Sequence, residues 1–167
     1  MSDSPAAQPP ADPAHDEPSN TMDALAQLSF LVQGVLTRAA GRHDLSVIQL
    51  RLLGILRDRR PGMLELARHL NLDKSSITGL VSRAEKRGLV QRQASAHDGR
   101  AVLVSLTPPG RDLVELCAGE VEAEIAALTA ELGPEEHRQI LDLAVKLLRA
   151  GRSSSSAGTV AQRPCPS

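Results

Sequence analysis

The chain has 167 residues, enough for one domain with a hydrophobic core and an extension at each end. Its formal net charge of −1 excludes a protein that is basic throughout, so affinity for nucleic acid would have to come from a local cluster of Lys and Arg. No apolar run approaches the roughly 18 residues that span a bilayer, and no secretory leader is recognisable, so we expect a cytoplasmic protein with no membrane partner.

The two ends of the chain have compositions that are typical of disorder. Residues 1–20 combine prolines and acids with no Lys or Arg, and residues 151–167 are rich in serine. We therefore expect disordered tails over 1–20 and 151–167, with an ordered span between them. The two cysteines, Cys117 and Cys165, make a poor disulfide framework and are typical of a reducing compartment.

Apolar residues recur at helical spacing through the first part of the ordered span. Thr21 is expected to cap a helix that runs to about Ala40, and a capping box of Ser46 and Gln49 predicts a second helix that ends near Arg59. A short helix over 63–70 and a turn follow, and they lead into another helix. These elements predict a helix-turn-helix unit.

The helix that follows Asp73 has two different faces, and it is expected to end at Gly88. The face predicted to be buried comprises Ile77, Leu80, Val81 and Ala84. The other face is short, polar and basic, which is typical of a helix that approaches base edges and phosphates. On it we predict base contacts by Ser75, Ser76, Thr78, Ser82 and Arg83 and phosphate contacts by Lys74 and Lys86.

Two short strands and a polar loop are predicted next. Residues 89–93 can pair with residues 101–106 around a loop that contains Asp98 and Arg100. From Asp73 to Arg100 there are six Lys or Arg against three acids, a local charge of +3 in a chain of net charge −1. A duplex favours such a cluster because the cations replace condensed counterions.

A long helix should follow the second strand, capped by Thr107 and with Pro108 in its first turn. Its apolar stripe, Leu113 to Leu128, is long for so small a domain, so we expect that a second copy of the chain covers it. Packing within one chain is the alternative. Gly133 and Pro134 should end this helix, and a last helix reaches about residue 150.

At these residues the sequence resembles the MarR family of winged helix-turn-helix transcriptional regulators. The resemblance covers about Leu45 to Leu113 and lies in LARHLNLDKSSITGLVSRAEKRGLVQR, then DGRA, then VSLTPPGR. It implies that helix 74–87 enters the major groove of DNA, that Arg100 reaches the minor groove, and that Asp98 orients Arg100. Two positions depart from the usual pattern. Arginine is frequent in the family at the position of Gly79, which puts one base or phosphate contact in question, and leucine is common where Ala84 suggests a less filled core.

The resemblance also implies a mostly helical α+β fold and a division of roles along the chain. A dimerisation helix would occupy residues 21–45, the winged helix-turn-helix domain 46–106, and two further dimerisation helices 107–150. In the family the first helix and the last two form the interface of a homodimer. Such a dimer implies a palindromic operator in double-stranded DNA.

Members of the family often bind small phenolic or carboxylate effectors between the dimer helices and the DNA-binding lobe. Because Phe30 is the only aromatic residue, a pocket here would be aliphatic, with Arg42, His43 and Arg51 as candidate anchors at its rim. Some relatives sense organic hydroperoxides with a cysteine near the start of the first helix. This chain has none there, and we expect Cys117 to be a packing residue.

No residue pattern predicts catalysis. The five histidines are scattered singly, so neither a metal site nor another cofactor is expected, and neither a GxSxG motif nor a glycine-rich phosphate loop is present. Glu135 and Glu136 fall at a helix start, where their charge complements the helix dipole. We therefore predict a homodimeric, sequence-specific DNA-binding regulator, a ligand-responsive repressor, and not an enzyme. The alternative is a winged-helix module that binds protein, which exposed apolar residues on helix 74–87 would favour.

Overall fold

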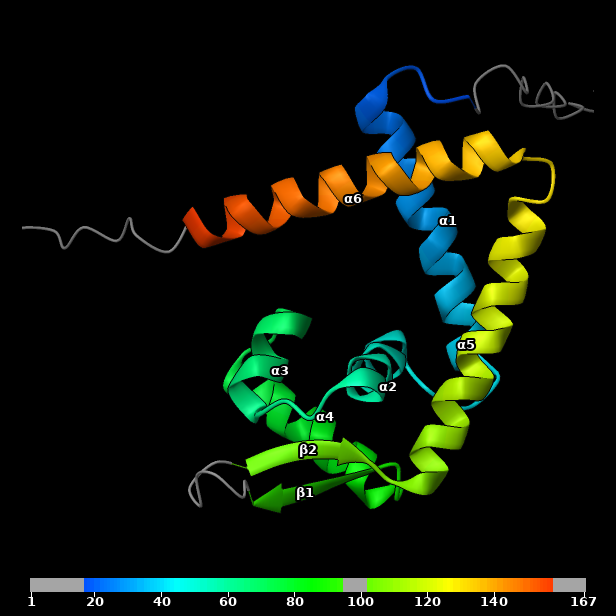
Figure 1. Cartoon of the computed structure of the whole chain (residues 1–167). Helices are drawn as coiled ribbons and strands as arrows, with labels where there is room; N and C mark the ends of the chain where they lie inside the picture. Colours follow the sequence, from blue (N-terminus) through cyan, green and yellow to red (C-terminus); the bar gives the residue numbers. More distant parts are fainter. Residues whose placement is uncertain (1–16, 95–101, 158–167) are drawn as a thin grey trace, which may run out of the picture. The chain divides into compact units, whose positions relative to one another are not determined.

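The computed structural model describes residues 17–94 and 102–157, with side chains as far as Gly151. Its elements, in chain order, are α1 (Thr21–Gly41), α2 (Val47–Asp58), α3 (Met63–Leu70), α4 (Lys74–Lys86), β1 (Val90–Ala94), β2 (Val102–Leu106), α5 (Pro108–Leu128) and α6 (Pro134–Ala157) (Figure 1). This is the predicted fold class, mostly helical with one small sheet. By its contacts the chain divides into two compact parts, residues 1–123 and 124–167.

Side-chain caps fix where α1 and α2 begin. Asn20, and not the predicted Thr21, caps α1, because its side-chain oxygen accepts a hydrogen bond from the backbone N–H of Asp23 at 3.0 Å. Thr21 is instead the first helical residue. The capping box of Ser46 and Gln49 is confirmed at the start of α2.

Strands β1 and β2 form the predicted antiparallel hairpin. Their register places Val90 opposite Leu106, so residues 90, 92 and 94 share one face of the sheet and residues 91 and 93 share the other. The backbone N–H of Val104 donates to the carbonyl of Pro61 at 3.0 Å. The connection between α2 and α3 is thereby attached to the sheet.

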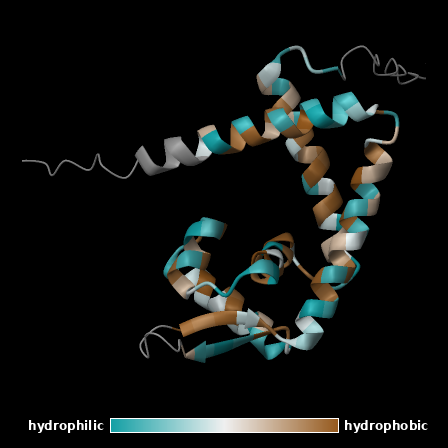
Figure 2. Cartoon of the chain, in the orientation of Figure 1, coloured by the Kyte–Doolittle hydropathy of each residue, from teal (hydrophilic) through white to brown (hydrophobic). Residues whose placement is uncertain are grey.

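The hydrophobic core of the first part lies between the helix-turn-helix and the hairpin. Its fully buried side chains are Val35, Leu52, Leu53, Leu66, Ile77, Leu80, Val81, Val90, Val104 and Cys117. The predicted inner face of α4 is confirmed, since Ala84 is buried as well, and Cys117 is a packing residue. Each large apolar side chain buried here contributes about 1.5–3 kcal/mol to stability. Figure 2 shows the apolar character of β2 against the hydrophilic β1.

The start of α5 packs closely against the residues that follow α4. The Thr107 hydroxyl donates to the carbonyl of Gly88 at 2.5 Å and accepts from the N–H of Gly110 at 3.1 Å, so Thr107 caps α5 as predicted. A Cβ on Gly110 would lie 1.9 Å from the carbonyl oxygen of Leu89, which leaves room only for glycine. These contacts fix the direction in which α5 leaves the hairpin.

Large apolar side chains are exposed on the helices outside the helix-turn-helix. They include Leu25, Leu28, Leu31 and Val32 of α1, Leu116 and Leu128 of α5, and Ile140, Leu141, Leu143, Leu147 and Leu148 of α6. Part of the predicted stripe on α5 is covered by the chain itself, because Cys117 is buried and Leu113 packs against the core. Helix α6 continues to Ala157 and does not end at the predicted Ala150. No helix in the described ranges is long and apolar enough to cross a membrane.

Candidate nucleic-acid interface

The turn between α3 and α4 has the geometry of a helix-turn-helix. Asn71 ends α3 in the left-handed conformation, with φ 52°, which asparagine tolerates better than most residues. The N–H of Leu72 donates to the carbonyl of Ala67 at 2.9 Å, and Asp73 then caps α4. The sequence predicted this unit from the same local signals.

The carboxylate of Asp73 organises the first turn of α4. It accepts from the backbone N–H groups of Ser75 and Ser76, both at 2.8 Å, and from their hydroxyls at 2.6 and 2.7 Å. These hydrogen bonds hold the pKa of Asp73 well below its usual range. The bond from the Ser75 hydroxyl has the largest effect, and the bond from the Ser76 hydroxyl the next largest. The negative charge also complements the positive end of the helix dipole.

The hydroxyl protons on the exposed face of α4 are already committed. Those of Ser75 and Ser76 point to Asp73, and the hydroxyl of Thr78 donates to the carbonyl of Lys74 at 2.7 Å. A hydroxyl has one proton and two lone pairs, so these three oxygens can still accept hydrogen bonds but cannot donate another. The three predicted base-contacting residues therefore present acceptors to a partner.

The cations on this face are available for contacts. Lys74, Arg83 and Lys86 are exposed, and among the described residues none of the three makes an ion pair. Gly79 is half-buried, and the guanidinium of Arg83 lies over it, 3.3 Å from where a Cβ would stand. A shallow hollow of about 290 Å³ separates α4 from the start of α2 here.

The wing, which is the hairpin of β1 and β2, is fastened to α4 by Arg92 of β1. One guanidinium nitrogen donates to Glu85 at 2.7 Å, and the other donates to the Ser82 hydroxyl oxygen at 2.9 Å. Ser82, a predicted base contact, is half-buried beside the wing and keeps its own proton free to donate. No local pattern in the sequence indicated this contact of Arg92.

The C-terminal end of α4 is also fastened to the turn between α1 and α2. Arg87 donates to the backbone carbonyls of Asp44 at 2.7 Å and His43 at 3.2 Å. Glu120 of α5 contacts the same turn, 2.9 Å from the His43 ring and 3.1 Å from Arg42. The hydrogen bond to His43 is the main cause that lowers the pKa of Glu120.

The candidate effector residues fall in two places. Arg42 and His43 are bound to Glu120, whereas Arg51 lines a hollow of about 230 Å³ between α1, α2 and α5. That hollow is otherwise bounded mainly by aliphatic side chains, together with Arg57 and Cys117. Asp98 and Arg100, which are predicted to contact DNA, lie outside the described residues.

Comparison with known proteins gives concordant findings. Residues 43–101 match the MarR family. The homoprotocatechuate degradative operon repressor of Escherichia coli is 30% identical over 114 residues, which cover 67% of this chain and 76% of the repressor. The uncharacterized HTH-type transcriptional regulator YdgJ of Bacillus subtilis is 29% identical over 83 residues, and the match spans about half of each chain, 50% and 51%.

Solved structures agree with these sequence relatives. The apo form of wild-type MarR from E. coli aligns with a TM-score of 0.67 over 80% of this chain and 99% of that one. At 24% identity this likeness shows the fold alone. The order of the elements and this likeness together show a winged-helix fold.

Proposed function

The chain belongs to the MarR family, and we propose that it is a homodimeric transcriptional regulator that recognises a specific sequence in double-stranded DNA. Members of this family are DNA-binding regulators of transcription and not enzymes. The observation that carries the proposal is the outer face of α4, where all exposed side chains are polar or basic. Such a face suits base edges and phosphates. A regulator of this kind would act in the cytoplasm.

The directions of the hydroxyl protons support a particular pattern of base recognition. Because Ser75, Ser76 and Thr78 offer only acceptors, they suit the amino groups of adenine and cytosine in the major groove. Arg83 offers only donors, which suit guanine. Lys74 and Lys86 flank these residues and suit the phosphates on either side.

Exposed apolar side chains support the homodimer. Leu25 and Leu28 of α1, and Leu143 and Leu147 of α6, are between 42% and 59% exposed in a single chain. Water disfavours so many exposed leucines, and a two-fold interface between copies would cover them. In such a dimer α4 would be the recognition helix of each copy, and the two recognition helices would meet half-sites whose centres are roughly 34 Å apart.

A small-molecule effector would fit the hollow between α1, α2 and α5. Its walls are mainly aliphatic, and Arg51 and Arg57 could pair with a carboxylate. Occupation of this hollow would change how α5 meets the DNA-binding elements, and hence the separation of the two recognition helices. The name of the E. coli relative, a repressor of a degradative operon, supports repression as the sign of regulation.

A mobility-shift assay with the purified protein and the DNA upstream of its own gene tests the proposal. We expect a discrete complex that survives excess random DNA, and footprinting should then show two half-sites in inverted orientation. A single isolated half-site would contradict the dimer, and equal competition by random DNA would contradict sequence-specific binding.

One observation favours the alternative of a protein-binding module. Leu64 of α3 is 66% exposed beside an apolar hollow of about 570 Å³ that also involves Met63 and Leu72. Exposed apolar surface of this kind is typical of protein contacts. If Leu64→Glu abolishes function in cells while DNA binding in vitro is unchanged, the module also has a protein partner.

A further inference from the structure

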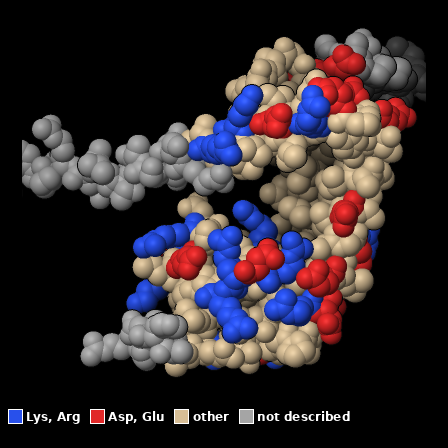
Figure 3. Space-filling model, in the orientation of Figure 1, with Lys and Arg blue, Asp and Glu red and all other residues tan. Residues whose placement is uncertain are grey.

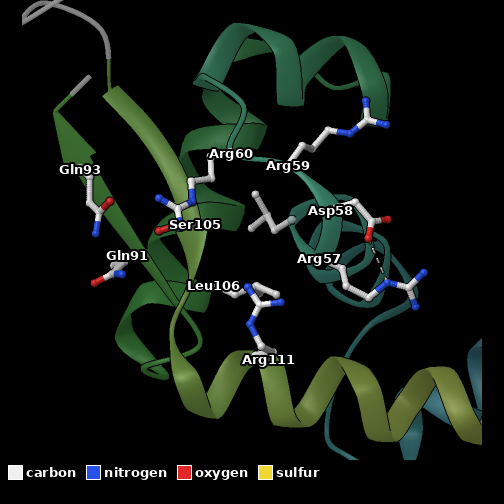
Figure 4. Close-up of a pocket in the computed structure, with 10 residues that line it drawn as sticks. Arg57, Asp58, Arg59, Arg60, Gln91, Gln93, Ser105, Leu106 and Arg111 are labelled. Atoms are coloured by element: carbon white, nitrogen blue, oxygen red, sulfur yellow. Dashed lines mark ion pairs between the residues drawn. The ribbon is translucent and has the colours of Figure 1, made fainter. Parts of the chain in front are cut away.

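A polar cavity lies beside the wing, at the end of α2 and the start of α5 (Figure 4). Its volume is about 280 Å³. The cavity is lined by one acid, Asp58, and by four arginines, Arg57, Arg59, Arg60 and Arg111. Figure 3 shows that Lys and Arg side chains gather on this face of the winged-helix part. The electrostatic potential here attracts anions.

The cavity lies on the face of the sheet that turns away from α4. Gln91 and Gln93 of β1 line it, and they alternate with Arg92, whose side chain contacts α4 on the other face. The hairpin therefore stands between the cavity and the recognition helix. A duplex held by α4 would therefore lie across the hairpin from this cavity.

A hydroxyl beside the cavity is buried and has no hydrogen-bond partner in the part of the chain that the structure describes. Ser105 is only 7% exposed, and its Oγ makes no hydrogen bond to any described residue. A buried polar group costs free energy unless it is hydrogen-bonded, so such orphans are rare in folded proteins. Ser105 stands opposite Gln91 in the sheet and lines the same cavity as the arginines.

Two of the arginines are also without counterions. Among the described residues, Arg60 and Arg111 make no ion pair, whereas Arg57 lies 3.5 Å from Asp58 and Arg59 lies 3.4 Å from a ring nitrogen of His69. In Figure 4, Arg60 reaches down toward Ser105 and Arg111 reaches up from α5 toward the centre of the cavity. Arg57 and Arg59 turn away from them in the same view.

We propose that this cavity binds a small phosphate-bearing molecule, held by Arg60, Arg111 and Ser105. A phosphate group has several acceptor oxygens and a double charge, and it matches two guanidinium forks and a hydroxyl better than a single carboxylate does. The cavity is at the small end of ligand sites, so it suits a small molecule and not a polymer. The ligand joins the α2–α3 connection, the wing and the start of α5.

Calorimetric titration of the full-length protein with inorganic phosphate, at constant ionic strength, tests this site. We expect saturable binding of one phosphate per chain. Arg60→Ala and Arg111→Ala should each weaken it about tenfold or more, the usual effect of losing a charged hydrogen bond. Arg138→Ala on α6 is the matched control, because this arginine pairs with Glu135 and does not line the cavity. The phosphate affinity of this variant should equal that of the wild type.

Ser105→Ala gives a second readout that does not depend on arginine charge. Without phosphate, the variant should melt at the same temperature as the wild type or higher, because it lacks a buried unpaired hydroxyl. With phosphate, its melting temperature should rise less than that of the wild type, because a ligand that binds more weakly stabilises the folded state less. Arg60→Lys, which keeps the charge but not the fork, should bind phosphate with intermediate affinity.

Two results would overturn the proposal. Equal phosphate affinity in the wild type, Arg60→Ala and Ser105→Ala would mean that phosphate binds elsewhere as an adventitious ion only. The second result is that Arg60→Ala and Arg111→Ala keep their phosphate affinity but bind duplex DNA more weakly in phosphate-free buffer. It would mean that the cavity contacts the DNA backbone. The phosphate titration does not require DNA, so its outcome is independent of the DNA-binding proposal.

Discussion

The guanidinium of Arg92 lies 2.7 Å from a carboxylate oxygen of Glu85, and this ion pair joins the first strand of the wing to the recognition helix. The same guanidinium holds the hydroxyl oxygen of Ser82 at 2.9 Å. Because the wing is fixed to α4, its position in one groove of the duplex would be set by the position of α4 in the neighbouring groove. We therefore expect the pair to affect DNA binding by positioning the wing relative to α4.

Loss of this pair should affect DNA binding more than stability. The side chains of Arg92 and Glu85 are 30% and 38% exposed, so solvent screens them, and either alanine variant should cost at most about 1 kcal/mol of folding stability. The loss of binding free energy for the operator should be larger than this loss of folding stability. A double-mutant cycle measured by both thermal unfolding and fluorescence anisotropy checks this. Additive effects on operator affinity would show that the pair does not position the wing.

The low pKa of Asp73 makes a pH-dependent prediction. Because its folded-state pKa lies below the unfolded value of about 3.9, its stabilising effect is complete above about pH 5 and is lost as the pH falls toward the folded-state pKa. Asp73→Asn keeps a helix cap but removes the charge. The wild type should be more stable than the variant at pH 7, and the gap should narrow below about pH 4. A gap that widens in acid would contradict this account.

The N-terminal tail should be dispensable for folding, although its last residue, Asn20, adds stability as the cap of α1. Deletion of residues 1–19 keeps the cap Asn20 and should leave the melting temperature nearly unchanged, because a Pro-rich acidic segment buries little apolar area. Asn20→Ala should cost about 1 kcal/mol, the usual effect of losing a helix cap. Differential scanning calorimetry compares the two. A large loss of stability on deletion would mean that the tail packs on the domain.

The proposed dimer can be split by charge. Leu128 is 49% exposed at the end of α5, and Leu128→Glu should place an uncompensated carboxylate in the interface. Sedimentation should then show monomers at a micromolar concentration at which the wild type should be a dimer. Leu64→Glu is the matched control, since this leucine is exposed on α3, and it should remain dimeric. A monomeric wild type would refute the interface.

Local signals in the sequence determined most of the fold. The bounds of α3, the capping box at Ser46 and the cap at Asp73 depend on neighbouring residues, and all three are as predicted. The cap of α1 is Asn20, one residue before the predicted Thr21, because both residue types suit that role and only the folded chain distinguishes them. Helix α6 runs past its predicted end because extending an existing helix is easier than starting one, even through a serine-rich segment.

The contacts that shape the candidate site depend on tertiary structure. Arg87 and Asp44 are 43 residues apart in sequence, and no periodicity joins them. The sequence predicts base contacts by Ser75, Ser76 and Thr78, but only the folded chain shows which acceptors their hydroxyl groups donate to. The arginines of the phosphate cavity come from α2, the segment after it and α5, so only the folded chain brings them to one place.

The division between base contacts and phosphate contacts is the most specific part of the DNA-binding proposal. Lys86→Ala should weaken binding equally for all duplexes, because a phosphate contact acts through counterion release. The slope of log affinity against log salt concentration should fall by about one. Arg83→Ala should instead weaken binding to the operator alone. Arg100→Ala should cost about 1–3 kcal/mol, the usual value for a good DNA contact, and Asp98→Ala should cost less.

Fluorescence anisotropy of the wild type, Arg83→Ala and Arg100→Ala on the operator and on a shuffled duplex, at matched salt, tests the central claim most directly. We expect the wild type to bind the operator at least about a thousandfold more tightly than the shuffled duplex. Arg83→Ala should narrow that ratio, and both variants should keep the wild-type fold by circular dichroism. If instead both variants bind the two duplexes as the wild type does, these residues do not read DNA, and the protein-binding alternative replaces the present proposal.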